Sequence, residues 1–189
     1  MEYSVSTLKT NTIQAATGTT VSLASGHTPS GFVPAGGILQ VKQSISATAS
    51  SAFNSRTFTD IPGMSVSITP SSTSSKILVS TSLSWGSAAN PYGGVRILRD
   101  SSNIAIGPNT SSGDTRATFG LQGVDNAYRL MCDNFQLLDT AVSTTSAVTY
   151  KLQWSTGVVL YLNRVNTLQS GNANTVSGVS TITVMEIAG

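Results

Sequence analysis

The sequence predicts an all-β protein: an antiparallel, jelly-roll-like β-sandwich preceded by an extended N-terminal arm or short shaft segment. The first reason is composition, because only 10% of the 189 residues are charged while 30 serines and 25 threonines supply the polarity. Threonine favours strands, and the lysine and glutamate that usually cover helix surfaces are scarce. The second reason is a period of two in the apolar residues, and the third is a series of short turns rich in Ser, Gly, Asn and Pro.

The alternation is clearest in three segments. Residues 64–69 read Met-Ser-Val-Ser-Ile-Thr, and residues 77–85 and 148–155 follow the same rule. Successive side chains of a strand point to opposite faces, so each segment has one buried and one solvated face. A short helix over residues 135–138 is the one alternative to strand structure. Weaker strands are expected at residues 38–46, 56–59, 94–99, 103–106, 116–121, 129–138, 158–162 and 181–187.

The final strand is apolar on both of its faces. Ile182 and Val184 fall on one face, whereas Met185 and Ile187 fall on the other. A strand of this kind is usually central in its sheet, with the opposing sheet on one side and a neighbouring subunit on the other. We therefore expect Met185 and Ile187 to lie in an oligomer interface.

The chain divides into an N-terminal segment, residues 1–37, and a sandwich domain, residues 38–189. The first segment is poor in apolar residues and ends in a linker rich in Gly and Pro. It contains only two very short predicted strands, residues 13–15 and 21–23. Strands this short cannot bury a core alone, so the segment is either disordered or supported by other copies or a partner. Three copies around an axis would satisfy this need. The predicted contact residues for attachment or oligomerisation are Leu8, Ile13, Val21 and Leu23.

Charge and motif content argue against enzymatic chemistry and against nucleic acid. The net charge is +2 and the basic residues are scattered, which is unlike a nucleic-acid surface. His27 is the single histidine, so a two-histidine metal site within one chain is excluded. Most of the eight carboxylates fall in predicted turns, where Asp caps backbone groups, rather than in a glycosidase pair. We expect no enzyme activity, no metal and no cofactor.

The single cysteine and the length of the apolar runs indicate in which cellular compartment the protein is assembled and whether it enters a membrane. Cys132 cannot form an internal disulfide, and its mostly apolar surroundings in the sequence predict a buried thiol. This cysteine usage fits assembly in a reducing cytoplasm. The first residues lack the pattern of a signal peptide, and the longest dense apolar run, residues 158–162, is too short to span a bilayer. We expect no membrane insertion.

Two tyrosines are candidate binding residues. Tyr92 stands in the loop sequence Asn-Pro-Tyr-Gly-Gly, and Tyr128 lies near another loop. Exposed aromatic side chains in loops can stack on sugars, so both are candidate glycan contacts. The alternative for Tyr92 is packing at a strand end. Trp85 and Trp154 lie on the apolar faces of their strands and are predicted core residues.

Residues 67–79, Ser-Ile-Thr-Pro-Ser-Ser-Thr-Ser-Ser-Lys-Ile-Leu-Val, carry a resemblance. They are similar to a segment of tailed-bacteriophage and prophage surface proteins, in which a Thr-Pro-Ser-x-x-Ser-Ser-Lys-Ile turn joins two strands of a small β-sandwich. Residues 94–100 resemble the next strand of those proteins, and residues 180–187 resemble their C-terminal strand.

Two further segments extend the resemblance. Asp139 and the run through residues 149–152 resemble an Asp-x-Pro…Thr-Tyr-Lys strand, although Val142 replaces the usual proline. Residues 12–21 resemble the Thr-Ile-Gln…Gly-Thr-Thr-Val repeats of phage fibre shafts and attachment segments.

The resemblance implies a homotrimeric knob, similar to the jelly rolls of the tumour-necrosis-factor and complement families. It implies a virion structural protein on the outer surface of the particle, made in the host cytoplasm. The expected partners are further copies of the chain and either the major capsid protein or a tail or baseplate protein. Capsid decoration (cement) or a head fibre is slightly favoured over a tail fibre, because the chain has no long shaft. The alternative is a tail-fibre receptor-binding module that recognises host surface glycans.

Overall fold

The computed structural model describes residues 33–87, 92–111, 113, 115–122, 127–169, 171 and 175–189. The chain separates into two compact units, Met1–Phe32 and Val33–Gly189, and the described residues belong to the second. Four predicted contact residues and the single histidine lie outside the described residues: Leu8, Ile13, Val21, Leu23 and His27.

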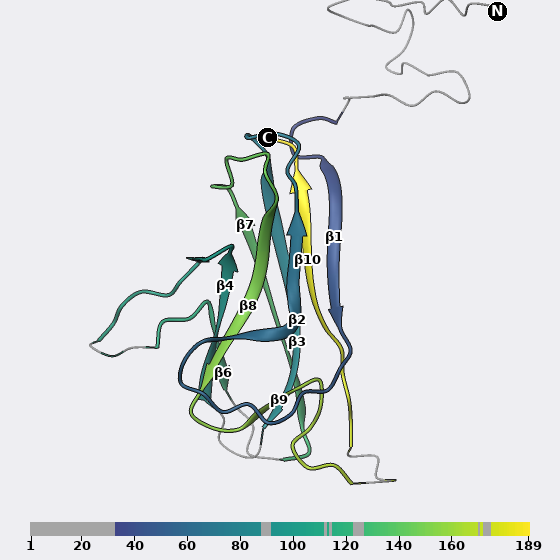
Figure 1. Cartoon of the computed structure of the whole chain (residues 1–189), viewed down its shortest axis with the longest axis vertical. Helices are drawn as coiled ribbons and strands as arrows, with labels where there is room; N and C mark the ends of the chain where they lie inside the picture. Colours follow the sequence, from purple (N-terminus) through teal and green to yellow (C-terminus); the bar gives the residue numbers. More distant parts are fainter. Residues whose placement is uncertain are drawn as a thin grey trace, which may run out of the picture. The chain divides into compact units, whose positions relative to one another are not determined.

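The second unit is a β-sandwich of two antiparallel five-stranded sheets (Figure 1), as the sequence predicts. The first sheet has the order β1-β10-β3-β7, with β9 paired to β3; its strands are β1 (Ile38–Ser46), β10 (Ser180–Ile187), β3 (Lys76–Ser87), β7 (Leu130–Asp139) and β9 (Leu160–Leu162). The second sheet has the order β2-β8-β4-β5, with β6 paired to β4; its strands are β2 (Thr59–Ile68), β8 (Val148–Thr156), β4 (Tyr92–Arg99), β5 (Ser102–Ile104) and β6 (Phe119–Gln122).

Strand β7 corrects two sequence-based expectations. Residues 135–138 continue the strand, so the short-helix alternative is wrong. The even-numbered residues of β7 face away from the core, and Cys132 is therefore exposed rather than buried. The apolar neighbours of Cys132 in the sequence suggested burial, but Leu130 and Met131 are only partly buried at this sheet edge.

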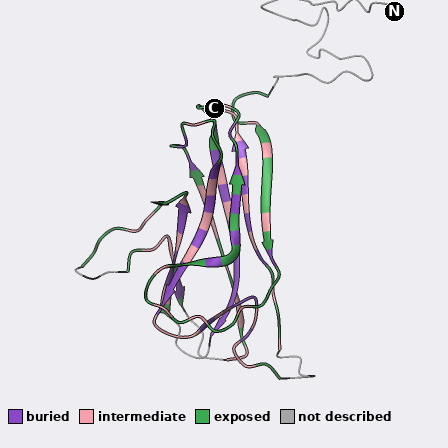
Figure 2. Ribbon diagram, in the orientation of Figure 1, coloured by how far each residue is buried: buried purple, intermediate pink, exposed green. Residues whose placement is uncertain are grey.

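The core lies between the sheets and is built from alternate residues of the strands (Figure 2). Trp85 and Trp154 are essentially fully buried, which confirms their prediction as core residues. Phe53, from the loop that joins β1 to β2, stacks on Trp154 with 4.7 Å between ring centroids. The other large buried side chains are Tyr150, Met64, Ile68, Ile77, Leu83, Ile97, Leu121, Leu152, Leu160 and Leu162.

A bulge in β2 ties one edge of the sandwich together. The register of β2 against β8 shifts between Asp60 and Ser65, and Gly63 has a φ of +75°. A Cβ at Gly63 would lie 2.9 Å from the Ser46 side chain, so the position requires glycine on both counts. The hydroxyls of Ser44 and Ser46 donate to the carbonyls of Gly63 and Pro62, which links β1 of one sheet to β2 of the other.

The chain enters and leaves this unit at one place. The Gly36 amide donates to the Ala188 carbonyl at 2.8 Å, and the Ala188 amide donates to the Gly37 carbonyl at 2.8 Å. Strands β1 and β10 continue this pairing from Ile38 and Ile187. The turn from β2 to β3 lies at the same end, because Lys76 pairs with Ile187.

A buried carboxylate organises this end of the sandwich. Glu186 is fully buried, on the same face of β10 as the buried Ile182 and Val184. Its Oε1 accepts hydrogen bonds from the Ser71 amide (2.6 Å), the Ser71 hydroxyl (2.7 Å) and the Ser75 hydroxyl (2.6 Å). Its Oε2 accepts one from Gln40 Nε2 at 2.6 Å. The serine-rich turn between β2 and β3 is thus wrapped around one carboxylate.

The hydrogen bonds set the charge state of Glu186. Burial alone raises the pKa of the carboxyl, but the hydrogen bonds from Ser75, Gln40 and Ser71 outweigh it and lower the pKa to about 2. A carboxylate with this many donors therefore stays ionised in the folded protein throughout the neutral and mildly acidic range.

A second buried carboxylate lies in the same row of the first sheet, because Ile77 of β3 pairs with Glu186 on one side and Asp139 on the other. Asp139 accepts two hydrogen bonds from Arg99 Nη1, at 2.9 and 2.8 Å, and one from the Tyr150 hydroxyl at 2.8 Å. Burial, and then the hydrogen bond and charge of Asp139, raise the pKa of Tyr150 well above its usual value. The phenol therefore remains a donor, and the cluster joins β7 to β4 and β8 across the core.

A third polar cluster joins the first sheet to the loop after β9. Asn163 is buried and has a φ of +59°. Its Nδ2 donates to the carbonyls of Ser46 (2.6 Å) and Thr48 (3.2 Å), and its Oδ1 accepts from the Ser180 hydroxyl at 2.6 Å. Ser180 in turn accepts from the Ser84 amide. Among the described residues, no buried side-chain nitrogen or oxygen lacks a hydrogen-bond partner.

We predict that Glu186→Gln destabilises the fold at pH 7 by about 1–3 kcal/mol, because the amide brings donors against the Ser71, Ser75 and Gln40 donors. The folded pKa of Glu186 lies below its unfolded value near 4.5, so its stabilisation is present above that pH and is lost as pH falls toward about 2. Urea denaturation at fixed protein concentration measures the free energy of unfolding. This free energy should be lower for the variant than for the wild type at pH 7, and the difference should become smaller below pH 4.5.

Asp60→Asn is the matched control. Asp60 is exposed and pairs with Lys151 at 2.8 Å, so its removal should cost at most about 1 kcal/mol at pH 7. If the two variants lost equal amounts of unfolding free energy at pH 7, a special role for the Glu186 cluster would be contradicted.

Candidate functional site

The outer face of the first sheet carries an apolar band. The strand registers place four residues in one row across the sheet: Val41 of β1, Met185 of β10, Leu78 of β3 and Leu138 of β7. Val41 is 51% exposed and Leu138 is 45% exposed, while Met185 and Leu78 are half-buried. The predicted contact residues Met185 and Ile187 both fall on this outer face. We call it the assembly face and define it as residues 41, 43, 45, 78, 80, 82, 132, 134, 136, 138, 181, 183, 185 and 187.

The polar groups of the assembly face are uncharged and partly satisfied within the sheet. Next to the apolar band runs a row of Gln43, Thr183, Ser80 and Gln136. Gln43 Nε2 donates to the Thr183 hydroxyl at 2.7 Å, and Gln136 Nε2 lies 3.4 Å from the Ser80 hydroxyl. Side chains that already bond one another lose less when water is removed from them. Lys76, which pairs with Ile187, is the charged residue at the rim of this face.

The outer face of the second sheet has a different character. Lys151 of β8 forms an ion pair with Asp60 of β2 at 2.8 Å, and Gln153 Nε2 donates to the same carboxylate at 2.7 Å. Arg96 of β4 pairs in register with Gln153. The hydrogen bonds and charge of Lys151, together with the hydrogen bond of Gln153, lower the pKa of Asp60. A charged face of this kind is suited to solvent, whereas the assembly face is not.

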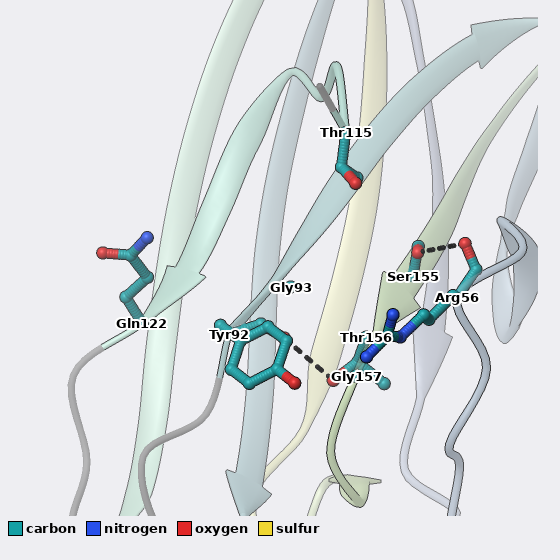
Figure 3. A pocket seen from close by; sticks show the side chains of 8 residues that line it. All are labelled: Arg56, Tyr92, Gly93, Thr115, Gln122, Ser155, Thr156 and Gly157. Atoms are coloured by element: carbon teal, nitrogen blue, oxygen red, sulfur yellow. Dashed lines mark hydrogen bonds between the residues drawn. The ribbon is translucent and has the colours of Figure 1, made fainter. Parts of the chain in front are cut away.

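A pocket of about 390 Å³ lies where β4 begins and β8 ends (Figure 3). Its volume is in the range of small-molecule sites, roughly 300–1,000 Å³. Thr156 Oγ1 donates to the Tyr92 carbonyl at 3.0 Å, which joins the two strands at the pocket. The residues that line it are Arg56, Tyr92, Gly93, Thr115, Gln122, Ser155, Thr156 and Gly157.

Tyr92 is the aromatic side chain of this pocket. It begins β4 and is 51% exposed, so it stands at a strand end and also presents its ring to solvent. The ring lies against Gly157, where an added Cβ would be only 2.4 Å from Tyr92 Cε2. Gly157 thereby leaves the space in which the ring rests.

Two polar side chains, those of Arg56 and Thr115, point into the pocket. Figure 3 shows the Arg56 side chain reaching toward Tyr92 from across the pocket, and the Thr115 hydroxyl pointing into it. Gln122 lines the pocket but points away from Tyr92 in the same view. Within the described part of the chain, no hydrogen bond or ion pair engages the Arg56 guanidinium, which is exposed.

The second candidate tyrosine lies elsewhere. Tyr128 is half-buried just before β7, and its hydroxyl accepts a hydrogen bond from Gln169 Nε2 at 3.0 Å. It does not line the Tyr92 pocket, so the structure does not bring the two tyrosines into one site. Glycan contact through either residue stays a prediction.

The described residues form neither a metal-binding cluster nor a membrane-spanning helix. No group of three or more His, Cys, Asp or Glu side chains is placed to hold a metal ion. No helix in the described ranges has the length and hydropathy that a membrane span needs.

No family model and no curated protein matches the chain. Among solved structures, the chain is similar to one in "Structure of infectious bursal disease virus Gx strain", with 16% sequence identity and a TM-score of 0.32. The match covers 80% of this chain and 43% of that one, so this chain spans less than half of the viral protein. A TM-score this low does not establish a common topology.

Sequence reasoning missed several of the residues that shape these surfaces. The sequence places Arg56 only in a weak predicted strand, although in the structure Arg56 supplies the one charge among the described residues that line the pocket. Val41, Leu78 and Leu138 were not connected with Met185, because their common row depends on the pairing of four strands. The alternation within each strand was the available signal, but it does not say which strands are neighbours.

Two glycines at the pocket should respond differently to alanine. At Gly93 an added Cβ would lie 2.5 Å from the Ser155 backbone carbonyl oxygen, which cannot move without breaking the β4–β8 pairing. We expect Gly93→Ala to destabilise the fold by about 1–3 kcal/mol. At Gly157 the clash is with the exposed Tyr92 ring, which can swing aside, so Gly157→Ala should cost less than about 1 kcal/mol.

Thermal unfolding would measure the stability difference, and the Tyr92 ring resonances would report the displacement in Gly157→Ala. Unfolding of Gly157→Ala at a lower temperature than Gly93→Ala would refute this account of the pocket.

Proposed function

We propose that this chain is a bacteriophage virion structural protein: a non-enzymatic, homotrimeric surface appendage that attaches to the particle through its N-terminal segment. Capsid decoration or a head fibre is slightly favoured over a tail fibre. The observation that carries the proposal is the assembly face, an apolar and uncharged sheet surface that a single copy leaves in water. Function consists in association by apolar burial, and no chemical step is required.

The chemistry of the assembly face supports a partner of the same kind. Apart from Lys76 at its rim, the assembly face carries no charged side chain, so it meets a copy of itself without burying unpaired charge at its centre. Burying unpaired charge would cost several kcal/mol per group. Closed symmetric association also covers the apolar band in every copy at once. The residues that would be covered include Val41, Leu78, Leu138, Met185 and Ile187.

The strand order supports the jelly-roll form of the sandwich. Strands β1, β3, β7 and β10 lie in one sheet, and β2, β4 and β8 lie in the other, so the long strands alternate between sheets along the chain. Jelly rolls are built from two sheets joined in this interleaved manner. In such an arrangement the assembly face and the charged face are on opposite sides of the sandwich.

We predict that Val41→Glu combined with Leu138→Glu converts the trimer to monomers. Both side chains are about half exposed in the single chain, so the charges are tolerated in a monomer but would be buried and repel one another around a shared axis. Light scattering after size-exclusion chromatography measures the mass, and circular dichroism checks the fold. Ser65→Glu, on the outer face of the second sheet, is the control and should remain trimeric. A monomeric wild-type protein would overturn the proposal.

A truncation tests the proposed division of labour. Removal of residues 1–35 leaves the Gly36–Ala188 hydrogen bond intact, so we expect a folded trimer. The shortened protein should no longer co-sediment with particles that lack the native protein, while the full chain should. Normal incorporation of the truncated protein would place attachment in the sandwich instead.

A second candidate function is recognition of host surface glycans, as in a tail-fibre receptor-binding module. The observation that favours it is the pocket at Tyr92, where an exposed aromatic ring adjoins hydroxyl and guanidinium donors. Aromatic rings with nearby polar groups suit the alternating apolar and hydroxyl surfaces of sugars. This function is compatible with the structural role, because the assembly face and the pocket use different residues.

A further inference from the structure

The Tyr92 pocket continues into a second hollow. A neighbouring pocket of about 430 Å³ shares Gly93, Thr115 and Gln122 with it and extends along β6, residues 107–110 and residues 115–118. The two hollows therefore form one groove, which we call the Tyr92 groove. The two hollows offer adjacent places for neighbouring units of an extended ligand.

The described residues that line the Tyr92 groove carry charge of one sign. Of these residues, Arg56 is the charged one in the first hollow, and Arg116 is the charged one in the second. Among the described residues, no carboxylate lines either hollow. An uncompensated guanidinium in a polar pocket attracts anions and binds carboxylate or phosphate oxygens with charge-assisted hydrogen bonds.

A third arginine adds to this field. Arg96 stacks on Phe58 with its Cζ 3.7 Å from the ring centroid, and its Nε donates to the Arg116 carbonyl at 2.8 Å. Burial, and next the charge of Arg116, lower the pKa of Arg96, so the two guanidinium groups are close enough to repel each other. Two mutually repelling cations beside the groove strengthen its preference for an anion.

We propose that the Tyr92 groove binds an acidic saccharide, with the Tyr92 ring stacked on a sugar face and the Arg56 guanidinium paired with a carboxylate or phosphate of the ligand. The inference rests on the second proposed function and adds the charge class of the glycan. Thr115 supplies a hydroxyl for hydrogen bonding to the sugar, and Arg116 contacts an acidic group further along the chain.

The test uses the full-length protein and a panel of oligosaccharides in matched pairs. One pair is a hyaluronan tetrasaccharide and its carboxyl-reduced counterpart, and others pair sialylated with desialylated and phosphorylated with dephosphorylated glycans. Saturation-transfer NMR detects binding and titration gives the affinity. We expect binding to acidic members only, and the pairs show whether carboxylate or phosphate is the recognised group. Binding should weaken as sodium chloride is raised, because salt screens an exposed ion pair.

Single-residue variants separate the contribution of the Arg56 charge to glycan affinity from that of stacking on Tyr92. Arg56→Gln should lower the affinity for the acidic members by roughly tenfold to a hundredfold, the range for a charge-assisted hydrogen bond. Arg129→Gln removes an exposed arginine outside the groove and should leave the affinity unchanged. Tyr92→Ala should lower the affinity by up to about tenfold through loss of stacking. Circular dichroism confirms that each variant is folded.

The outcomes distinguish the two levels of the proposal. Binding to acidic members that is weakened by Arg56→Gln supports the inference. Binding to neutral members that is insensitive to Arg56→Gln but lost in Tyr92→Ala overturns the acidic class and leaves glycan recognition standing. The absence of binding across the whole panel overturns both the inference and the second proposed function.

Discussion

The register of β10 between β1 and β3 is the constraint on which the rest of the structure depends. Because side chains alternate along a strand, a slip of one residue would exchange its two faces completely. In the observed register Ile182, Val184 and Glu186 face the core, and Met185 and Ile187 face outward. The same pairing therefore fills the core, delivers a carboxylate to the serine-rich turn and completes the apolar band of the assembly face.

Much of the fold follows from the sequence, because strand structure is a local property. The strand predicted at residues 38–46 has the bounds of β1, and those predicted at 94–99 and 181–187 lie within β4 and β10. In each case alternation and flanking turn residues are sufficient signals. Less regular segments were placed less well: residues 116–121 gave a strand only from Phe119 onward.

The sites were harder to predict, because they join residues that are distant in the chain. The core-facing position of Glu186 is predictable, since the residue continues the i, i+2 series of Ile182 and Val184. Its hydrogen-bond partners in the turn are not, because they lie more than 110 residues away in the sequence. For Cys132 the sequence-based prediction of burial was wrong. Its apolar neighbours in the sequence suggested a buried thiol, but the residue is exposed at a sheet edge. Arg56 reaches the Tyr92 pocket through the packing of loops, for which the sequence carries no periodic signal.

The hydrogen bonds that join Gly36 and Gly37 to Ala188 have a consequence for how this unit can be used. A polypeptide whose two ends leave side by side can be spliced into a surface loop of a host protein as a guest, with little distortion of either partner. The Tyr92 groove begins where β8 ends. Strand β8 starts beside Ile68, at the same end of the sandwich as the Gly36–Ala188 hydrogen bond (Figure 1). If the unit were inserted at that end, the Tyr92 groove with its arginines would lie at the opposite end, away from the host protein. The unit could therefore present this groove to a ligand in solution.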